Sequence, residues 1–374
     1  MTPPSASKQS NAPRALFLSP ETPEPGTGGG GMRSASLLAY LRARYKVDVV
    51  GFDLRPHSRS TLSRTWRNSV RFVRGRPPLL DRFSGYESQL EARLSGRYDL
   101  SVIEHFWCAP YARLLRAHCD RLVLDLHNIE SALAESHARA VGGPVAMMFR
   151  RFARSYTRLE REWLPQFDLV LAASENDRQR IEHPNVVVFP NSLPELARPE
   201  VREENCIAFS GNLEYHPNVE AVRWFHQAIW PSVRREFLQL EWRLIGRSPE
   251  AVMGIVGRDD RIRLTGPVND AVAALARAKL AVVPLLSGSG TRFKILEAWA
   301  AGRAVVSTTL GAEGLDARDG EHLVISDDAE TFATAIARLL QDDALRARLG
   351  SAGRAHYLDR FTWPVAWRAL DDRL

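Results

Sequence analysis

The sequence is poor in cysteine and contains no long apolar run. Its 374 residues include only Cys108, Cys119 and Cys206, whose spacing forms neither a ligand cluster nor a disulfide framework. Such sparse use of cysteine is typical of proteins from a reducing compartment. No stretch reaches the roughly 18 consecutive apolar residues that a membrane-spanning helix requires. We therefore predict a cytoplasmic protein without a transmembrane helix.

Lysine is also scarce, and basic charge is unevenly spread. The chain has four lysines against 46 arginines, so a lysine within a motif is not simply its usual surface cation. Residues 1–190 hold 27 basic and 19 acidic side chains, whereas the remainder of the chain holds 23 and 25. The basic surplus therefore belongs to the first half of the chain.

No acidic residue interrupts the segment from Arg55 to Arg76. Its arginines are Arg55, Arg59, Arg64, Arg67, Arg71, Arg74 and Arg76, and its apolar stripe is Leu62, Trp66, Val70 and Val73. This pattern predicts a helix with one apolar and one cationic edge. Such a helix either packs on its own domain or contacts anionic lipid headgroups or an anionic acceptor. Nucleic acid is not indicated, because no recognisable binding module accompanies the charge.

Short, mostly β-branched runs alternate with helical patterns after residues 1–13, which we predict to be a disordered tail and not a signal peptide. The runs span 15–19, 46–52, 99–105, 121–126, 168–173 and 186–190, then 206–211, 240–246, 261–266, 280–285, 303–308 and 322–326. This alternation predicts an α/β fold with two Rossmann-like, doubly wound parallel sheets joined near residue 195. We predict that the segment 360–374 is a helix that crosses back to the first domain.

Each predicted sheet has a glycine-rich turn at the carboxyl end of its first strand. The glycines are Gly26, Gly28, Gly29, Gly30 and Gly31 in the first domain, and Gly211, followed by Asn212, in the second. Bare backbone amides at such a turn can approach a phosphate closely, and open α/β sheets bind ligands at this edge. We expect the first helix to begin at Met32. Two such turns facing one cleft predict a nucleotide-linked substrate.

A dinucleotide site is an alternative interpretation of the first turn. Gly26, Gly28 and Gly31 satisfy the spacing GxGxxG, and Asp53 ends the next predicted strand. These glycines begin only after a proline-rich insertion, whereas the dinucleotide fingerprint follows its strand directly. A nicotinamide or flavin oxidoreductase is therefore the less favoured function.

The stretch GSGTRFKILEAWAAG, residues 288–302, brings two cations and a carboxylate into the first turns of one predicted helix. We expect this helix to start at Thr291, with its free amides and positive dipole facing the cleft. Arg292 and Lys294 add a planar fork and a point charge that suit a diphosphate. Glu297 can accept both hydrogen bonds of a ribose diol. The alternative is that Lys294 and Glu297 form an ordinary surface pair.

Together these motifs resemble the retaining glycosyltransferases of the family-four group, which have the GT-B fold. The matching segments are SGTRFKILEAWAAGRAVVSTTLGAEGL (289–315), FSGNLEYHPNVEAVRWF (209–225), LTGPVND (264–270), DLHNIES (125–131), FPNS (189–192) and FTW (361–363). The resemblance implies an acceptor-binding domain, 14–195, completed by the returning helix 360–374. It also implies a donor-binding domain for the nucleotide sugar, 196–359.

The resemblance implies roles for individual residues. The candidate substrate-binding residues are Gly30, Gly31, Gly211, Asn212, Gly266, Val268, Ser289, Gly290, Thr291 and Glu297, and the candidate catalytic residues are His127, Arg292 and Lys294. Glu297 would hold the ribose, and the backbone from Gly266 to Val268 would hold the base. His127 would meet the donor sugar, and Arg292 with Lys294 would hold the diphosphate.

The sequence departs from the family pattern in two places. Many members have two glutamates eight positions apart, the first of which contacts the donor sugar, and here that position is Ser289. Many members also have Arg and Lys in the glycine turn of the second domain, where this chain has GNLEYHPN, 211–218. Arg292 and Lys294 are candidates to replace those cations.

The implied activity is the transfer, with retention, of a sugar from a nucleotide-diphosphate sugar to a hydroxyl of a glycan, a lipid-linked glycan or a small molecule. Polysaccharide biosynthesis is the corresponding process. No metal or other cofactor is expected, because the ten histidines show no ligand spacing. The alternatives are a nucleotide-sugar binding protein without transfer activity and a GT-B epimerase. We expect a cytoplasmic protein with peripheral contact to an anionic membrane surface.

Overall fold

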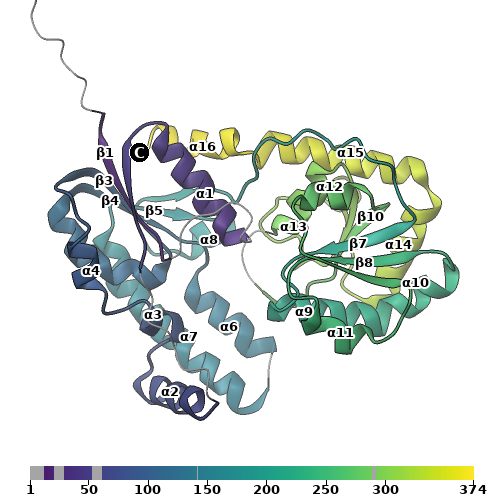
Figure 1. Cartoon of the computed structure of the whole chain (residues 1–374), viewed down its shortest axis with the longest axis horizontal. Helices are drawn as coiled ribbons and strands as arrows, with labels where there is room; N and C mark the ends of the chain where they lie inside the picture. The colour runs from purple at the N-terminus through teal and green to yellow at the C-terminus, as the bar shows by residue number, and fades with distance from the viewer. Residues whose placement is uncertain (1–11, 21–28, 53–60, 141, 289–291) are drawn as a thin grey trace, which may run out of the picture.

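A computed structural model describes most of the chain. The described residues are 12–20, 29–52, 61–140, 142–288 and 292–374. Predictions that fall outside them concern most of the tail 1–13 and Gly26, Gly28, Asp53, Arg55, Arg59, Ser289, Gly290 and Thr291. The described residues form two α/β domains that lie side by side (Figure 1).

The first domain contains a six-stranded parallel sheet with the order β2-β1-β3-β4-β5-β6. Its strands are β1 (Arg14–Leu18), β2 (Lys46–Val50), β3 (Tyr98–Glu104), β4 (Cys119–Asp125), β5 (Leu169–Ala172) and β6 (Val186–Val188). Each strand coincides with a predicted run, because β-branched apolar stretches suit a parallel strand that is buried on both faces.

The second domain also contains a six-stranded parallel sheet, with the order β12-β11-β10-β7-β8-β9. Its strands are β7 (Cys206–Ser210), β8 (Glu241–Ile245), β9 (Ile262–Gly266), β10 (Leu280–Val283), β11 (Ala304–Ser307) and β12 (Val324–Ile325). All six lie within predicted runs. The predicted α/β fold with two doubly wound parallel sheets is therefore confirmed.

Helices pack around both sheets (Figure 1). In the first domain they are α1 (Gly29–Arg42), α2 (Thr61–Arg74), α3 (Pro78–Arg82), α4 (Glu87–Glu91), α5 (Ala112–Leu115), α6 (Glu130–Ala140), α7 (Gly143–Trp163) and α8 (Glu175–Arg180). The later helices are α9 (His216–Trp224), α10 (Trp230–Glu236), α11 (Glu250–Val256), α12 (Ala271–Ala276), α13 (Phe293–Ala300), α14 (Ala329–Gln341), α15 (Asp343–Arg360) and α16 (Trp363–Asp371).

The last helix, α16, packs on the first domain. Ala366 and Leu370 are buried in the same apolar cluster as Phe17 of β1 and Leu41 of α1. Burial of these side chains removes apolar surface from water and so holds the helix in place. The chain therefore ends on the domain in which it began.

The two segments that connect the domains are bonded to each other. The amide of Leu193 donates to the carbonyl of Phe361 at 3.0 Å, and its carbonyl accepts from the amide of Trp363 at 2.9 Å. The indole N–H of Trp363 donates to the carbonyl of Ser192 at 3.2 Å. The connection between the domains is thus a pair of segments fixed side by side.

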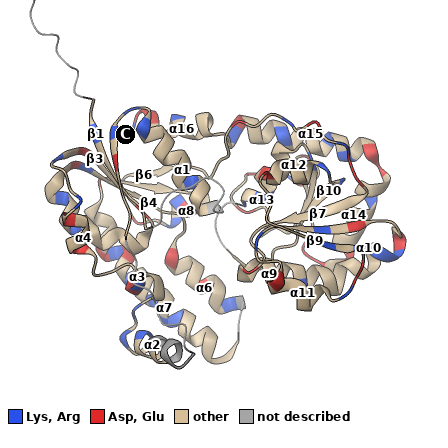
Figure 2. Cartoon of the chain, viewed as in Figure 1, with Lys and Arg blue, Asp and Glu red and all other residues tan. Residues whose placement is uncertain are grey.

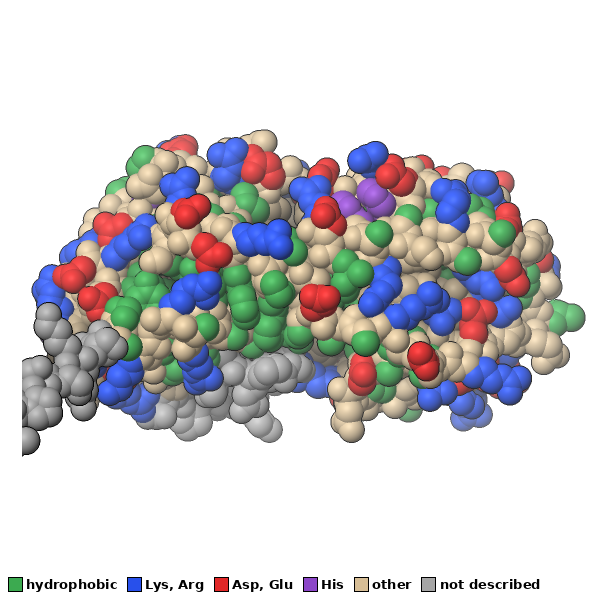
Figure 3. Space-filling view, turned by 90° about the horizontal axis from the view of Figure 1, so that it is seen from above, with side chains coloured by type: hydrophobic (Ala, Val, Ile, Leu, Met, Phe, Trp, Pro, Cys, Tyr) green, Lys and Arg blue, Asp and Glu red, His purple; other side chains and the backbone are tan. Residues whose placement is uncertain are grey.

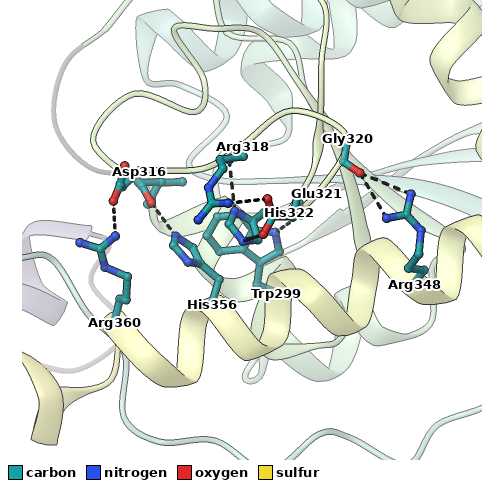
Figure 4. A network of polar contacts seen from close by, with 10 residues as sticks. Trp299, Asp316, Arg318, Gly320, Glu321, His322, Arg348, His356 and Arg360 are labelled. Atoms are coloured by element: carbon teal, nitrogen blue, oxygen red, sulfur yellow. Dashed lines mark hydrogen bonds and ion pairs between the residues drawn. The ribbon is translucent and has the colours of Figure 1, made fainter.

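A polar network fastens α15 to the loop after β11 (Figure 4). The ring of His356 stacks on that of His322, with their centroids 4.2 Å apart. Arg360 forms an ion pair with Asp316, and the indole N–H of Trp299 donates to the carbonyl of His322 at 3.1 Å. These contacts fix the loop against the helix that leads back to the first domain.

Candidate active site

The strand order places the ligand-binding edge of each sheet. In the first sheet the order reverses between β1 and β3, and in the second it reverses between β7 and β10. Open α/β sheets bind ligands outside the carboxyl ends of the strands at such a point. In the second domain these ends are Ser210 of β7 and Val283 of β10. The loop after β10 leads through Arg292 to α13, which carries Lys294.

A cavity of about 710 Å³ lies at this edge of the second sheet. The predicted residues that line it are Gly211, Asn212, Val268, Arg292, Lys294 and Glu297. Met32 of α1 and Leu193 of the domain connection also line it, so the cavity lies between the domains. Its volume is in the range of about 300 to 1,000 Å³ that small-molecule sites occupy.

The ammonium of Lys294 lies at the carboxyl edge of the second sheet. Its Nζ donates to Oδ1 of Asn218 at 2.9 Å and lies 5.2 Å from the centre of the Phe209 ring. A Cβ placed on Gly211 would lie 3.5 Å from this Nζ, so the ammonium faces the strand-end turn. Burial lowers the pKa of Lys294 to about 8. An anion bound here would stabilise the charged ammonium and raise that pKa.

Glu297 lies one turn after Lys294 on the same helix. Its carboxylate accepts a hydrogen bond from Oγ of Ser210 at 3.1 Å. Burial raises the pKa of Glu297, while Ser210 and Lys294 act in the opposite direction. Because Lys294 and Glu297 both line the cavity and have different hydrogen-bond partners, the alternative of an ordinary surface pair does not fit.

Arg292 lines the cavity, and its guanidinium also donates to backbone carbonyls of two loops. It is buried, and it donates from Nη2 to the carbonyl of Gly288 at 3.0 Å and from Nε to that of Leu310 at 3.3 Å. The helix begins at Phe293 and not at Thr291, because Arg292 has the non-helical angles φ −89° and ψ 84°. The guanidinium therefore connects the loop that contains Gly288 with the loop that contains Leu310.

Glycines end the strands at this edge because the backbones approach one another closely. A Cβ on Gly246, which follows β8, would lie 1.8 Å from the carbonyl oxygen of Gly211. The amide of Gly246 donates to the carbonyl of Gly266 at 3.1 Å, and Gly266 has a φ of 71°. Gly266 thus supports the edge, whereas Val268, two residues later, lines the cavity.

The glycine-rich turn of the first domain is partly helical. Helix α1 begins at Gly29 and not at Met32, so Gly30 and Gly31 belong to its first turn. The low helix propensity of glycine does not prevent this, because tertiary packing supplies most helical stability in proteins. A Cβ on Gly30 would lie 3.5 Å from Nδ1 of His127. The structure therefore brings two predicted elements of the first domain together.

His127 follows β4 and is almost fully buried. Its Nε2 lies 3.3 Å from Oδ2 of Asp125 and 3.5 Å from Oε1 of Glu104. Burial acts to lower the pKa of His127, but contact with Asp125 and Glu104 outweighs it and the pKa is raised. The imidazole is therefore held by carboxylates on one side and faces Gly30 with Nδ1.

Glu104, Asp125 and His127 also bring ligand atoms within 4.8 Å of one another, as a metal site would require. The two oxygens of Asp125, however, already accept from Nε of Arg33, at 3.0 Å each. Arg33 is itself buried, so a cation already occupies one side of this group. We therefore assign no metal to it.

Sequence reasoning did not single out Asn218 or Arg33. Asn218 accepts from Lys294 and donates from Nδ2 to the carbonyl of Asn212 at 2.7 Å, which connects the strand-end turn to the helix α13. Arg33 is the one charged residue in MRSASLLAY, a stretch of mostly small and apolar residues. A charge in such a helix is a signal for a buried partner, because unpaired charges are not buried.

The fold matches solved glycosyltransferase structures of the GT-B class. Sucrose-phosphate synthase from Thermosynechococcus elongatus superposes with a TM-score of 0.68 at 17% identity and covers 95% of this chain and 97% of its own. Alr3699/HepE from Anabaena, solved in complex with UDP and glucose, has a TM-score of 0.63 at 15% identity, with coverage of 96% and 98%. The chain therefore has the GT-B fold.

The second domain matches a family model as well. Residues 204–342 match glycosyl transferases group 1, which confirms the predicted resemblance for this region. A phosphatidyl-myo-inositol mannosyltransferase from Mycobacterium leprae is 35% identical over 144 residues, or 36% of this chain. The match spans 37% of the length of that relative. Within the described residues, no helix is long and apolar enough to cross a membrane.

Proposed function

We propose that this chain is a retaining glycosyltransferase that moves a sugar from a nucleotide-diphosphate sugar to a hydroxyl of a glycan, a lipid-linked glycan or a small molecule. The observation that carries the proposal is that Lys294 and Glu297 both line the interdomain cavity, within the segment that matches glycosyl transferases group 1. Their spacing suits a diphosphate beside a ribose diol.

The chemistry follows from the charges at this edge. Breaking the bond between the sugar and the diphosphate develops negative charge on the departing oxygen. A cation that is already fixed beside the diphosphate stabilises this charge more in the transition state than in the ground state. The side-chain oxygen Oδ1 of Asn218 accepts a hydrogen bond from the ammonium of Lys294 without neutralising it. In the retaining mechanism we propose, the departing phosphate takes the proton of the acceptor hydroxyl.

Glu297→Gln is expected to weaken the affinity for nucleoside diphosphates by about 1 to 3 kcal/mol, because the substitution removes one charge-assisted acceptor from a buried site. Calorimetry with UDP and GDP measures this change. Glu250→Gln, on the exposed start of α11, is the matched control and should bind as the wild type does. Wild-type affinity in Glu297→Gln, or binding of NAD but of no nucleoside diphosphate, would contradict the proposal.

A nucleotide-sugar binding protein without transfer activity is the second candidate. It is favoured by Ser289, which occupies the position where many members of the resembled family have a glutamate. The two candidates differ in turnover and not in affinity. A binding protein would hold the nucleotide sugar without releasing nucleoside diphosphate in the presence of glycan or lipid-linked acceptors.

The helix α2 supports a contact with anionic membrane surfaces. Within the predicted apolar edge, the side chains of Trp66 and Val73 are 69% and 72% exposed, whereas Val70 is half-buried. Basic residues lie along α2 and α7 at the outer end of the first domain (Figure 2). By contrast, both signs of charge are interspersed on the face shown in Figure 3. An exposed tryptophan among arginines is typical of helices that bind the membrane interface.

Trp66→Ser is expected to reduce binding to anionic vesicles severalfold, because the indole anchors α2 while the arginines contribute about 1 kcal/mol each near the surface. Co-sedimentation at increasing salt measures the effect, which should fade as charges are screened. Leu238→Ser, at a 70% exposed position of the second domain, is the control. Equal binding to neutral and anionic vesicles would exclude the contact.

A further inference from the structure

Glu104 is a buried carboxylate that the mechanism does not use. It ends β3 and is 0% exposed. Within the described part of the chain, neither of its oxygens has a hydrogen-bond partner of regular geometry. Its nearest ion-pairing group is His127, whose Nε2 lies 3.5 Å from Oε1. A buried carboxylate without a compensating charge is strongly unfavourable, so the state of His127 decides how this charge is accommodated.

The neighbouring carboxylate, Asp125, is already neutralised. Both of its oxygens accept from the guanidinium of Arg33, which is 1% exposed. Burial would raise the pKa of Asp125, but Arg33 and His127 outweigh it and hold that pKa well below its ordinary value. One cation and one anion therefore pair here, which leaves His127 as the ion-pairing group nearest to Glu104.

The other groups around His127 do not supply the missing positive charge. His105 stacks against His127, with ring centroids 3.7 Å apart, and burial together with His127 holds the pKa of His105 well below its ordinary value. Burial raises the pKa of Glu130, at the start of α6, to about 8, so this carboxyl adds little negative charge near neutral pH. His127 is thus the group that can offer a positive charge to Glu104.

The geometry also fixes the direction of both ring protons. With Nε2 turned toward Asp125 and Glu104, the opposite nitrogen, Nδ1, faces Gly30 in the first turn of α1. Glycine has no side chain there that could cover the imidazole. An imidazolium in this position would present one N–H to the carboxylates and the other N–H toward Gly30.

We propose that Glu104 is a positioning residue that, with Asp125, holds His127 as an imidazolium whose Nδ1–H is directed toward the donor at Gly30. The ligand that receives this hydrogen bond rests on the proposed function, in which it is a sugar or phosphate oxygen of the nucleotide sugar. The charge state of His127 does not depend on that function.

The test is the titration of His127 in the free protein, followed by the Cε1–H resonance in NMR and assigned with His127→Asn. The wild-type midpoint is expected above the ordinary value of about 6.5. Glu104→Gln should lower the protonation constant at least tenfold. Glu160→Gln, which changes a half-buried carboxyl that contacts Ser131, should leave the midpoint unchanged.

Two results would overturn the proposal. One is a wild-type midpoint at or below the ordinary histidine value, which needs no variant and so does not depend on how Glu104→Gln folds. The other is a folded Glu104→Gln with the wild-type midpoint. With a nucleotide-sugar substrate, Glu104→Gln should also lower kcat above neutral pH while KM for the donor is kept. An elevated midpoint in a protein without transferase activity would leave the proposal standing and refute the proposed function.

Discussion

Lys294→Ala is expected to lower turnover by about a hundredfold or more, the effect of losing one preorganised electrostatic donor. The ammonium stabilises charge that grows as the bond to the diphosphate breaks, so kcat should fall more than donor affinity. Steady-state kinetics with the nucleotide-sugar donor and single-turnover measurements separate the two effects. Because the pKa of Lys294 is about 8 in the free site, the wild-type affinity for the diphosphate should also weaken above that pH.

Lys279→Ala is the matched control for this prediction. Lys279 precedes β10, at the amino end of the strand whose carboxyl end leads to Lys294. Both substitutions remove one of only four lysines, but only one of them removes a charge from the cavity. Wild-type kcat in a folded Lys294→Ala protein would show that this ammonium does not act on the leaving group.

Arg33→Leu is expected to lower the free energy of unfolding by about 3 to 5 kcal/mol, because it leaves the buried Asp125 without its partner. The guanidinium also donates to Oδ1 of Asn191 at 3.1 Å and to the carbonyl of Phe189, so three segments lose a common contact. Urea denaturation measures the change. Replacing both residues, as in Arg33→Leu with Asp125→Asn, should recover part of the loss.

The control, Arg44, lies in the turn two residues after the end of α1. Arg44 pairs with Asp371, and the two side chains are 39% and 45% exposed. Exposed pairs contribute about 0 to 1 kcal/mol, so Arg44→Leu should have a small effect. If Arg33→Leu and Arg44→Leu had the same free energy of unfolding, the buried pair would not stabilise the contact between α1 and β4 more than an exposed pair does.

The twelve strands could be predicted because each is a short run whose pattern depends on local burial alone. The run RLVLDL, 121–126, overlaps β4 up to Asp125, the last four residues of that strand are buried, and no distant partner is needed to recognise it. Helix starts were harder to predict. Arg292 has a non-helical conformation while it bonds Gly288 and Leu310, and Leu310 lies 18 positions further along the chain.

The sequence predicted those parts of the candidate site whose residues lie within a single motif. Lys294 and Glu297 are three positions apart on one helix, so their common direction follows from helix geometry. The cluster around His127 could not be derived in this way, because Arg33 and Asp125 are 92 positions apart and meet only through the sheet. Glu104 and His127 likewise come from the ends of adjacent strands, and their contact requires the strand order.

The two connecting segments bonded at Leu193 limit how the domains can move. A single flexible linker would allow one domain to rotate freely about several axes. Two segments bonded side by side can bend together in one direction. The hydrogen bonds between them resist twisting of the pair and sliding of one segment along the other. We therefore expect any change in the width of the interdomain cavity to follow one rotation, about an axis through this pair, in the manner of hinge motions.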